Sequence, residues 1–577
     1  MFTKYFVRTQ ERPIGLKYDI VTERYVIGGH MSLLENIHAV MRDFFKIELD
    51  SRKLHRRVVS VNKIRFSTRV DAELFRLGTA LLFVVGVMLY SGMSVGQVPN
   101  SYMLIIASMI GGYMAINIGA NDVANNVGPA VGSKAITLTG AIMIAVIFEA
   151  AGALIAGGDV VSTIKSGIID PALINNADSF VWLMTAALLA GAVWLNIATA
   201  MGAPVSTTHS IVGGVLGAGI AAGGFGIANW ESMGEIVASW VISPVMGGVI
   251  AAAILYFIKH TITYKGDKMA SAAGTVVPLL IALMAWAFAT YLILKGLKKI
   301  WAVEFQTALG FGLAIGAVTY VVLRPILARR VTLISNDKEG VNRLFIVPLI
   351  CAAALLSFAH GANDVANAIG PLAAINDSIL HGAINSKAAI PLWVMLVGAL
   401  GIAVGLALYG PKLIRTVGSE ITELDQMRAF CVALSAAITV IIATNLGLPV
   451  SSTHVAVGGI FGVGFLREYL KTTYSKMVLD IQYHHHGQDE AAVEAYLAEF
   501  KVASIDKKAE MLKQLKAKTG TTQLSKFERK KLKGVYRHEL VKRSQLKRIV
   551  MAWLVTVPVS GLLAALLYFT IRGMMLP

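Results

Sequence analysis

Charged residues are scarce in this chain, and cysteine is almost absent. Asp, Glu, Lys and Arg make up 15% of the 577 residues, whereas hydrophobic residues make up 55%. A soluble globular domain carries about 25% charged residues, so the composition excludes an ordinary soluble protein and indicates a polytopic membrane protein. The two cysteines, Cys351 and Cys431, lie in separate apolar runs without the spacing of a metal site.

The first 74 residues lack the apolar core that a cleavable signal peptide needs. They are rich in Lys and Arg, as are several loops, and the chain has a formal net charge of +17. Basic segments of this kind mark the cytoplasmic side of a membrane protein rather than a nucleic-acid partner. We therefore expect the N-terminus and residues 467–548 to be cytoplasmic and the protein to lie in the cell (inner) membrane.

Apolar runs long enough to cross a hydrocarbon core of about 30 Å recur along the chain. They predict an all-α polytopic membrane protein with about 12–13 transmembrane helices, of which the shortest could be broken or re-entrant at the midplane. The runs lie at 75–94, 101–118, 135–157, 180–202, 207–223, 236–258, 275–295, 304–323, 344–362, 388–409, 428–446, 454–467 and 549–571.

Two strings occur twice. GANDVANNVGPA at 119–130 returns as GANDVANAIGPL at 361–372, and MGAPVSTTHSIVGG at 201–214 returns as LGLPVSSTHVAVGG at 446–459. Repeated apolar segments that are interrupted by Gly and Pro are typical of secondary transporters, whose site lies between the repeats. Packing of small residues explains the Gly and Ala of these strings, but it does not explain a buried Asn-Asp pair.

These paired strings resemble the PiT family of inorganic phosphate transporters. The resemblance covers about residues 75–468 and the last span. It implies symport of inorganic phosphate with a cation, either Na⁺ or H⁺, and no cofactor. Small departures are Asn126 opposite Ala368 and Ser452 opposite Thr207. A permease of the same fold for sulfate or a metal-phosphate complex is the alternative, and an anion channel is a competing class.

The span count places the two copies of GANDVAN in opposite orientations, since seven crossings separate them. The repeats are therefore predicted to be inverted. We divide the chain into a basic cytoplasmic segment at 1–74, an extra span at 75–94, repeat 1 at 95–260, linking spans with a basic loop at 261–343, repeat 2 at 344–468, a polar cytoplasmic insert at 469–547 and a last span at 548–577.

The duplicated strings contain no Arg or Lys, so an anion must be bound by hydroxyls, amides and backbone N–H groups. Each PVS string is predicted to open a half-helix, because proline is tolerated in the first turn of a helix. Helix N-termini attract anions. The expected phosphate ligands are Asn121, Asn125, Ser206, Thr207, Thr208, Asn363, Asn367, Ser451, Ser452 and Thr453.

Asp122 and Asp364 would repel phosphate, and an ionisable group at this depth costs about 2.5–3.5 kcal/mol. The nearest lysines, Lys134 and Lys387, precede the next apolar runs and should reach water. We therefore expect mobile cations to balance the two aspartates. Glu149 lies within an apolar run. It either binds a further cation or relays a proton, or it is neutral and hydrogen-bonded to a neighbouring helix.

Other roles are not expected. Ser-Thr-Thr-His is the one candidate for a nucleophile with a base, and its repetition in opposed orientation favours binding over catalysis. His209 and His454 are expected to pack rather than bind substrate. The histidines at 484–486 lack a second set of metal ligands. The expected partners are phosphate, a cation and the lipid bilayer, with a homo-oligomer possible.

Overall fold

A computed structural model describes most of the apolar body of the chain. The described residues are 73–94, 101–174, 176–201, 205–296, 303–384, 390–420, 424–484 and 543–575, and two short strands. The chain divides into two units, Met1–Leu77 and Gly78–Pro577. In the first unit, β1 (Val7–Arg8) pairs antiparallel with β2 (Asp19–Ile20). The polar insert predicted at 469–547 lies largely outside the described residues.

The second unit is helical in its described parts. A helix at Glu73–Ser94 enters it. The first group of elements that follows is α3 (Ser101–Asn121), α4 (Val123–Gly132), α5 (Leu138–Ala156), α6 (Gly158–Ser162), η1 (Thr163–Gly167), η2 (Pro171–Leu173), α7 (Ala177–Ala200), α8 (Thr207–Gly223), η3 (Phe225–Ile227) and α9 (Trp230–Thr261). The second group is η4 (Thr263–Lys268), α10 (Met269–Tyr291), η5 (Leu292–Gly296), α11 (Phe305–Val331), α12 (Lys338–Leu344), α13 (Ile346–Asp364), α14 (Ala366–His381), α15 (Leu392–Glu420), α16 (Gln426–Asn445), α17 (Ser452–His484) and α21 (Arg543–Met575).

Eleven described helices are long and apolar enough to cross a membrane. The fold is therefore the nearly all-helical membrane fold predicted from the sequence. The sequence predicted up to thirteen spans, and the two that are not among the eleven are the runs at 207–223 and 454–467. The helix α8 has 17 residues, or about 25 Å at 1.5 Å per residue, which is less than the hydrocarbon core. The second run forms only the first part of α17, which continues through charged residues to His484.

The two repeats exchange helices. The helix α3 of the first repeat packs on α15 of the second, and α13 of the second packs on α5 of the first. Glycines allow both contacts, because a Cβ added to Gly119 would meet the carbonyl of Ile402, and one added to Gly361 would meet the carbonyl of Glu149. Gly119 and Gly361 hold the same place in the duplicated string, so the contacts correspond.

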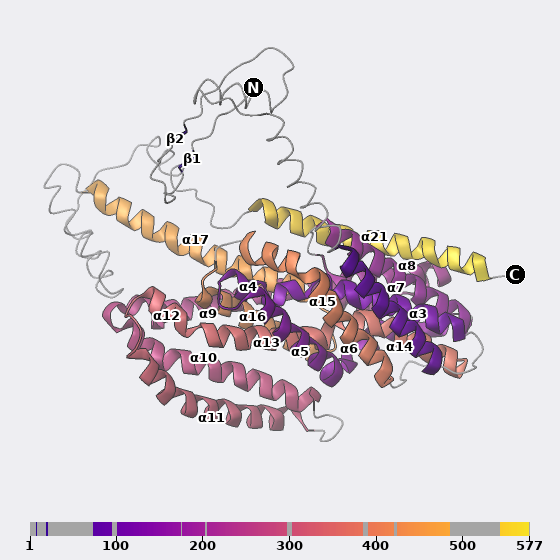
Figure 1. Ribbon diagram of the computed structural model, residues 1–577, viewed down its shortest axis with the longest axis horizontal. Coiled ribbons are helices and arrows are strands. Elements are labelled where there is room, and N and C mark those ends of the chain that lie inside the picture. The colour runs from indigo at the N-terminus through magenta and orange to yellow at the C-terminus, as the bar shows by residue number, and fades with distance from the viewer. Residues whose placement is uncertain are drawn as a thin grey trace, which may run out of the picture. The chain divides into compact units, whose positions relative to one another are not determined.

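A second exchange joins the later helices. The helix α9 lies against α17, and α21 lies against α8, as Figure 1 shows for α21 and α8. Gly217 of α8 faces Gly561 of α21, while Gly462 of α17 faces Gly248 of α9. Small residues of this kind let helix backbones approach closely inside a membrane. By this pairing, α21 is the counterpart of α9.

The centre of the unit contains the helices that carry the duplicated strings. The most apolar stretches of Ser101–Gly132 and Ile346–His381, the spans that carry the GANDVAN strings, are 72% and 78% buried, whereas those of α11 and α21 are each 17% buried. The helices α10 and α11 form a hairpin along one side (Figure 1). The exposed apolar surface of α11, which includes Phe311, Val318 and Val321, is what a helix in contact with lipid requires.

We expect the glycine contacts between exchanged helices to set the stability of the fold. Gly217→Val or Gly462→Val forces two backbones apart, and overpacking of this kind costs about 1–3 kcal/mol. The control is Gly310→Val on α11, where an added Cβ meets no atom within 4 Å. Thermal unfolding in detergent should show a lower midpoint for the first two variants only. An unchanged midpoint for both would contradict the close contacts.

Candidate substrate and cation site

The two copies of GANDVAN form two broken helices. The helix α3 ends at Asn121, and α4 begins at Val123, so Asp122 lies at the break. In the second copy the break falls at Val365, directly after Asp364. Pro129 and Pro371 lie inside the helices that follow. An internal proline has no N–H to bond the carbonyl four residues earlier. Pro129 therefore leaves the carbonyl of Asn125 without its helical bond, and Pro371 does the same for Asn367.

The hydroxyl strings open α8 and α17, as the sequence predicted. Ser206 Oγ accepts a hydrogen bond from the backbone N–H of His209 at 3.1 Å, and Ser451 Oγ accepts one from His454 at 3.3 Å. These are N-caps, which satisfy one of the open N–H groups of a helix start. Two helix N-termini are thus directed at the centre of the protein, where they favour negative charge.

The hydroxyls bind the aspartates. Thr207 Oγ1 donates to Asp122 Oδ2 at 2.6 Å, and its counterpart Ser452 Oγ donates to Asp364 Oδ2 at 2.9 Å. Thr453 Oγ1 lies 3.1 Å from Asp122 Oδ1, so the second repeat also reaches the aspartate of the first. All of these side chains are buried. The duplicated strings therefore form one site rather than two.

The amides of Asn125 and Asn367 use their N–H groups on hydroxyls of the opposite repeat. Asn125 Nδ2 donates to Thr453 Oγ1 at 2.8 Å, and Asn367 Nδ2 donates to Thr208 Oγ1 at 3.2 Å. Their amide oxygens are buried and have no hydrogen-bond partner among the described residues. A buried acceptor without a partner is costly, and an oxygen of this kind suits a cation better than an anion.

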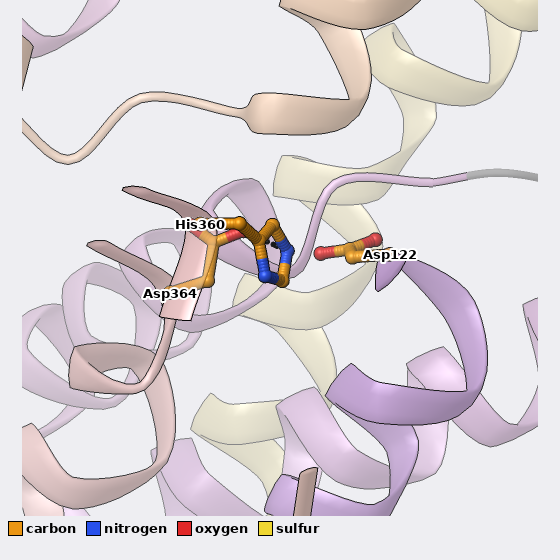
Figure 2. Close-up of side chains that lie close together, drawn as sticks. All are labelled: Asp122, His360 and Asp364. Carbon is orange, nitrogen blue, oxygen red and sulfur yellow. Dashed lines mark ion pairs between the residues drawn. The ribbon is translucent and has the colours of Figure 1, made fainter. Parts of the chain in front are cut away.

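His360 is a site residue that the sequence analysis missed. Its Nε2 lies 2.8 Å from Asp364 Oδ2, and its Nδ1 lies 2.7 Å from Glu149 Oε2. Figure 2 shows the imidazole beside Asp364 and facing Asp122. Ligand atoms of Asp122, His360 and Asp364 all lie within 4.8 Å of one another. The sequence analysis named only mobile cations as partners that could balance the two aspartates. The imidazole of His360 is a further partner, and it belongs to the protein itself.

The site departs from two-fold symmetry at this point. Asn126 Nδ2 donates to Glu149 Oε1 at 2.8 Å, so Asn126, Glu149 and His360 form a buried polar cluster next to Asp364. The aligned strings make Ala368 and Ile118 the counterparts of Asn126 and His360, and the glycine contacts make Ile402 the counterpart of Glu149. All three counterparts are buried and apolar. The polar cluster thus accompanies one aspartate only.

Comparisons with known proteins identify the family of this chain. The phosphate transporter family matches residues 118–564. The chain belongs to the phosphate transporter family. It is 54% identical over 516 residues to a protein of Helicobacter pylori strain J99 named "Putative phosphate permease", covering 87% of this chain and 96% of that protein. A protein of Pyrococcus furiosus with a similar name is 40% identical over 378 residues, and the match covers 66% of this chain and 90% of that protein.

A solved structure entitled "The sodium-dependent phosphate transporter" resembles this member of the family. The two share 32% identity with a TM-score of 0.65, and the match covers 82% of this chain and all of the other. Membership in a transporter family agrees with the prediction that the protein is not an enzyme.

The structure brings together the site residues that were expected from the sequence. All of them are buried in one region: Asn121, Asp122, Asn125, Glu149, Ser206, Thr207, Thr208, Asn363, Asp364, Asn367, Ser451, Ser452 and Thr453. Asn121 Nδ2 donates to Thr199 Oγ1 at 2.9 Å, and the amide of Asn363 lies 2.9 Å from Thr444 Oγ1. These two asparagines therefore attach the broken helices to α7 and α16.

His209 and His454 lie behind the hydroxyls and pack on tryptophans. The ring of His209 lies 3.9 Å from that of Trp240, and the ring of His454 lies 3.6 Å from that of Trp553. The two imidazoles contact each other edge to face at 4.4 Å. Their packing role was predicted. Lys134 is exposed, as expected, whereas Lys387 and the side chains of histidines 484–486 lie outside the described residues.

We expect that the polar cluster can be replaced by the apolar residues of the other half without loss of stability. His360→Ile alone leaves Glu149 and Asp364 buried without their partner, and breaking a buried pair costs about 3–5 kcal/mol. The triple variant Asn126→Ala, Glu149→Ile, His360→Ile copies Ala368, Ile402 and Ile118. Its unfolding midpoint should recover, while phosphate uptake should stay lost. A single variant as stable as wild type would contradict this account.

The hydroxyl that donates to Asp122 can be tested by comparing two substitutions of Thr207. Thr207→Ala removes the donor to Asp122, and a hydrogen bond to a charged group contributes about 1.5–3 kcal/mol. The half-saturation concentration for uptake should rise about 10-fold or more, since 1.4 kcal/mol is one decade. Thr207→Ser should keep near wild-type values, because serine serves at the corresponding Ser452. Equal kinetics for the Ala and Ser variants would remove this hydroxyl from the site.

Proposed function

We propose that this member of the phosphate transporter family takes up inorganic phosphate across the cytoplasmic membrane together with a cation, with Na⁺ as the preferred ion. The observation that carries the proposal is the pair of buried aspartates between two helix N-termini. The carboxylates repel phosphate, while the helix N-termini attract it. A cation bound at the carboxylates removes the repulsion, so binding of one ion favours binding of the other.

The ligand atoms near the aspartates support a hard cation. Carboxylate and amide oxygens are the ligands that such ions prefer, and the orphan oxygens of Asn125 and Asn367 are adjacent. We therefore assign these two oxygens to the cation rather than to phosphate. The carbonyls that Pro129 and Pro371 release from helical bonding are further oxygen ligands. The sodium dependence in the name of the solved relative supports Na⁺ over H⁺.

Phosphate is assigned to the N-termini of α8 and α17. Thr208 and Thr453 lie in the first turns of these helices, and each contacts the asparagine of the opposite repeat. We assign their hydroxyls and the N–H groups beside them as the donors to phosphate. Inverted repeats offer such a site to each side of the membrane in turn, which supports transport rather than a permanently open channel.

The proposal is tested by uptake of radiolabelled phosphate into proteoliposomes. A sodium gradient at fixed pH and a pH gradient without sodium are imposed separately, with arsenate and sulfate as competitors. We expect the sodium gradient to drive accumulation and arsenate to compete. Accumulation with the pH gradient alone would assign the coupling to H⁺. Uptake of sulfate but not phosphate would overturn the substrate, and flux that never exceeds equilibrium would indicate a channel.

The aspartates provide the decisive variants. Asp122→Asn and Asp364→Asn keep the shape of the side chain but remove one negative charge each, so the site should lose a cation. Accumulation should fall at least about 10-fold, or 1.4 kcal/mol, with normal unfolding midpoints. The control is Asp377→Asn on α14, a buried aspartate that pairs with His381 at 3.0 Å. Sodium-driven uptake at the wild-type level in either site variant would remove that aspartate from coupling.

A further inference from the structure

The second hydroxyl string is reached through a short loop without regular structure. The helix α16 ends at Asn445 and α17 begins at Ser452, and residues 448–451 between them are neither helix nor strand. Gly447 has a φ of +69°, a left-handed conformation that glycine adopts readily. The path of this loop sets where Ser452 and Thr453 lie, so a contact that holds the loop also positions these hydroxyls.

Two side chains of the first repeat hold this loop by its carbonyls. Thr163 of η1 donates from Oγ1 to the carbonyl of Gly447 at 2.8 Å, and Trp240 of α9 donates from Nε1 to the carbonyl of Pro449 at 3.2 Å. Neither donor belongs to the duplicated strings. Because the donors come from different elements and bond to different carbonyls, they fix the loop at two points.

Both donors lie on elements that are packed closely against the second repeat. A Cβ added to Gly370 of α14 would lie 3.0 Å from the side chain of Ile164, the residue after Thr163. On α9, a Cβ added to Gly248 would lie 3.0 Å from the carbonyl of Gly458 on α17. The elements that carry the donors are therefore held in place by contacts outside the loop.

Trp240 also contacts the first hydroxyl string. The centres of its ring and of the His209 ring are 3.9 Å apart, and His209 follows Thr207 and Thr208 on α8. The ring of His209 contacts that of His454, which belongs to the second string, at 4.4 Å. Trp240 thus joins the two strings, by its ring to the first and by its N–H to the loop of the second.

We propose that Thr163 and Trp240 are positioning residues for the second hydroxyl string, which they hold in place before phosphate binds. The proposal rests on the assignment of phosphate to the N-termini of α8 and α17. Without the two bonds the loop has more conformations, and only the fraction with correctly placed donors binds phosphate. The apparent affinity falls by that fraction, whereas the loaded protein has the wild-type geometry and should keep its maximum rate.

The test variants each remove one donor and keep the shape of the side chain. Trp240→Phe keeps an aromatic ring but lacks the N–H, and Thr163→Val lacks the hydroxyl, which Thr163→Ser restores. The matched controls are Trp286→Phe, which removes a similar bond between α10 and α11, and Thr319→Val, which removes a bond within α11. All are full chains, and the two test variants alter different elements, so each tests the proposal if the other does not fold.

Sodium-driven uptake into proteoliposomes is measured over a range of phosphate concentrations. In each test variant the half-saturation concentration should rise about 3- to 10-fold, as expected for the loss of one neutral hydrogen bond, while the maximum rate stays close to wild type. Thr163→Ser and the two controls should match wild type. A purely structural role would instead lower the maximum rate, through a smaller amount of folded protein, and leave half-saturation unchanged.

Hydrogen exchange without phosphate tests the loop independently of transport. The backbone amides of residues 446–455 should exchange faster in both test variants than in wild type and the controls, because exchange reports local opening. Unchanged exchange in both test variants, or wild-type half-saturation in both, overturns the proposal. If the wild-type protein takes up no phosphate, the proposed function fails instead, and exchange alone decides whether Thr163 and Trp240 hold the loop.

Discussion

The repulsion between two buried carboxylates governs the centre of this protein. Ligand atoms of Asp122, His360 and Asp364 lie within 4.8 Å of one another, and two like charges at that distance repel by about 3 kcal/mol at an effective dielectric of 20. Hydroxyls from Thr207 and Ser452 reduce the cost but cannot remove it. Positive charge nearby would lower the cost further, and the buried amide oxygens of Asn125 and Asn367 have no hydrogen-bond partner among the described residues.

The exchange of helices between repeats is what brings the carboxylates together. Because α3 packs on α15 and α13 packs on α5, each broken helix lies between elements of the other repeat. Gly119 and Gly361 make this possible, since a side chain at either would collide with a backbone carbonyl. These glycines serve helix packing, and the site depends on them as well, because the close packing brings its residues together.

The two halves of the site have similar sequences but different electrostatics. His360 connects Glu149 with Asp364, whereas Ile118 and Ile402 hold the corresponding places beside Asp122. A buried polar cluster is favourable only when its members satisfy one another. Asp364 therefore contacts an imidazole directly, whereas the hydrogen bonds of Asp122 are to the hydroxyls of Thr207 and Thr453. The two aspartates have different surroundings, although their motifs are nearly identical.

The sequence by itself determined the membrane fold, the repeats and the helix starts at the hydroxyl strings. These follow from local chemistry, namely hydrophobic length, proline position and capping residues. Only the tertiary structure decided that Thr453 reaches Asp122, that the amides of Asn125 and Asn367 present oxygen rather than N–H, and that His360 joins Glu149 to Asp364. The sequence did contain one sign of His360, which precedes the second GANDVAN where Ile118 precedes the first. Its role depends on a contact between residues 211 positions apart, and the pairing of distant helices is set by packing that no local pattern specifies.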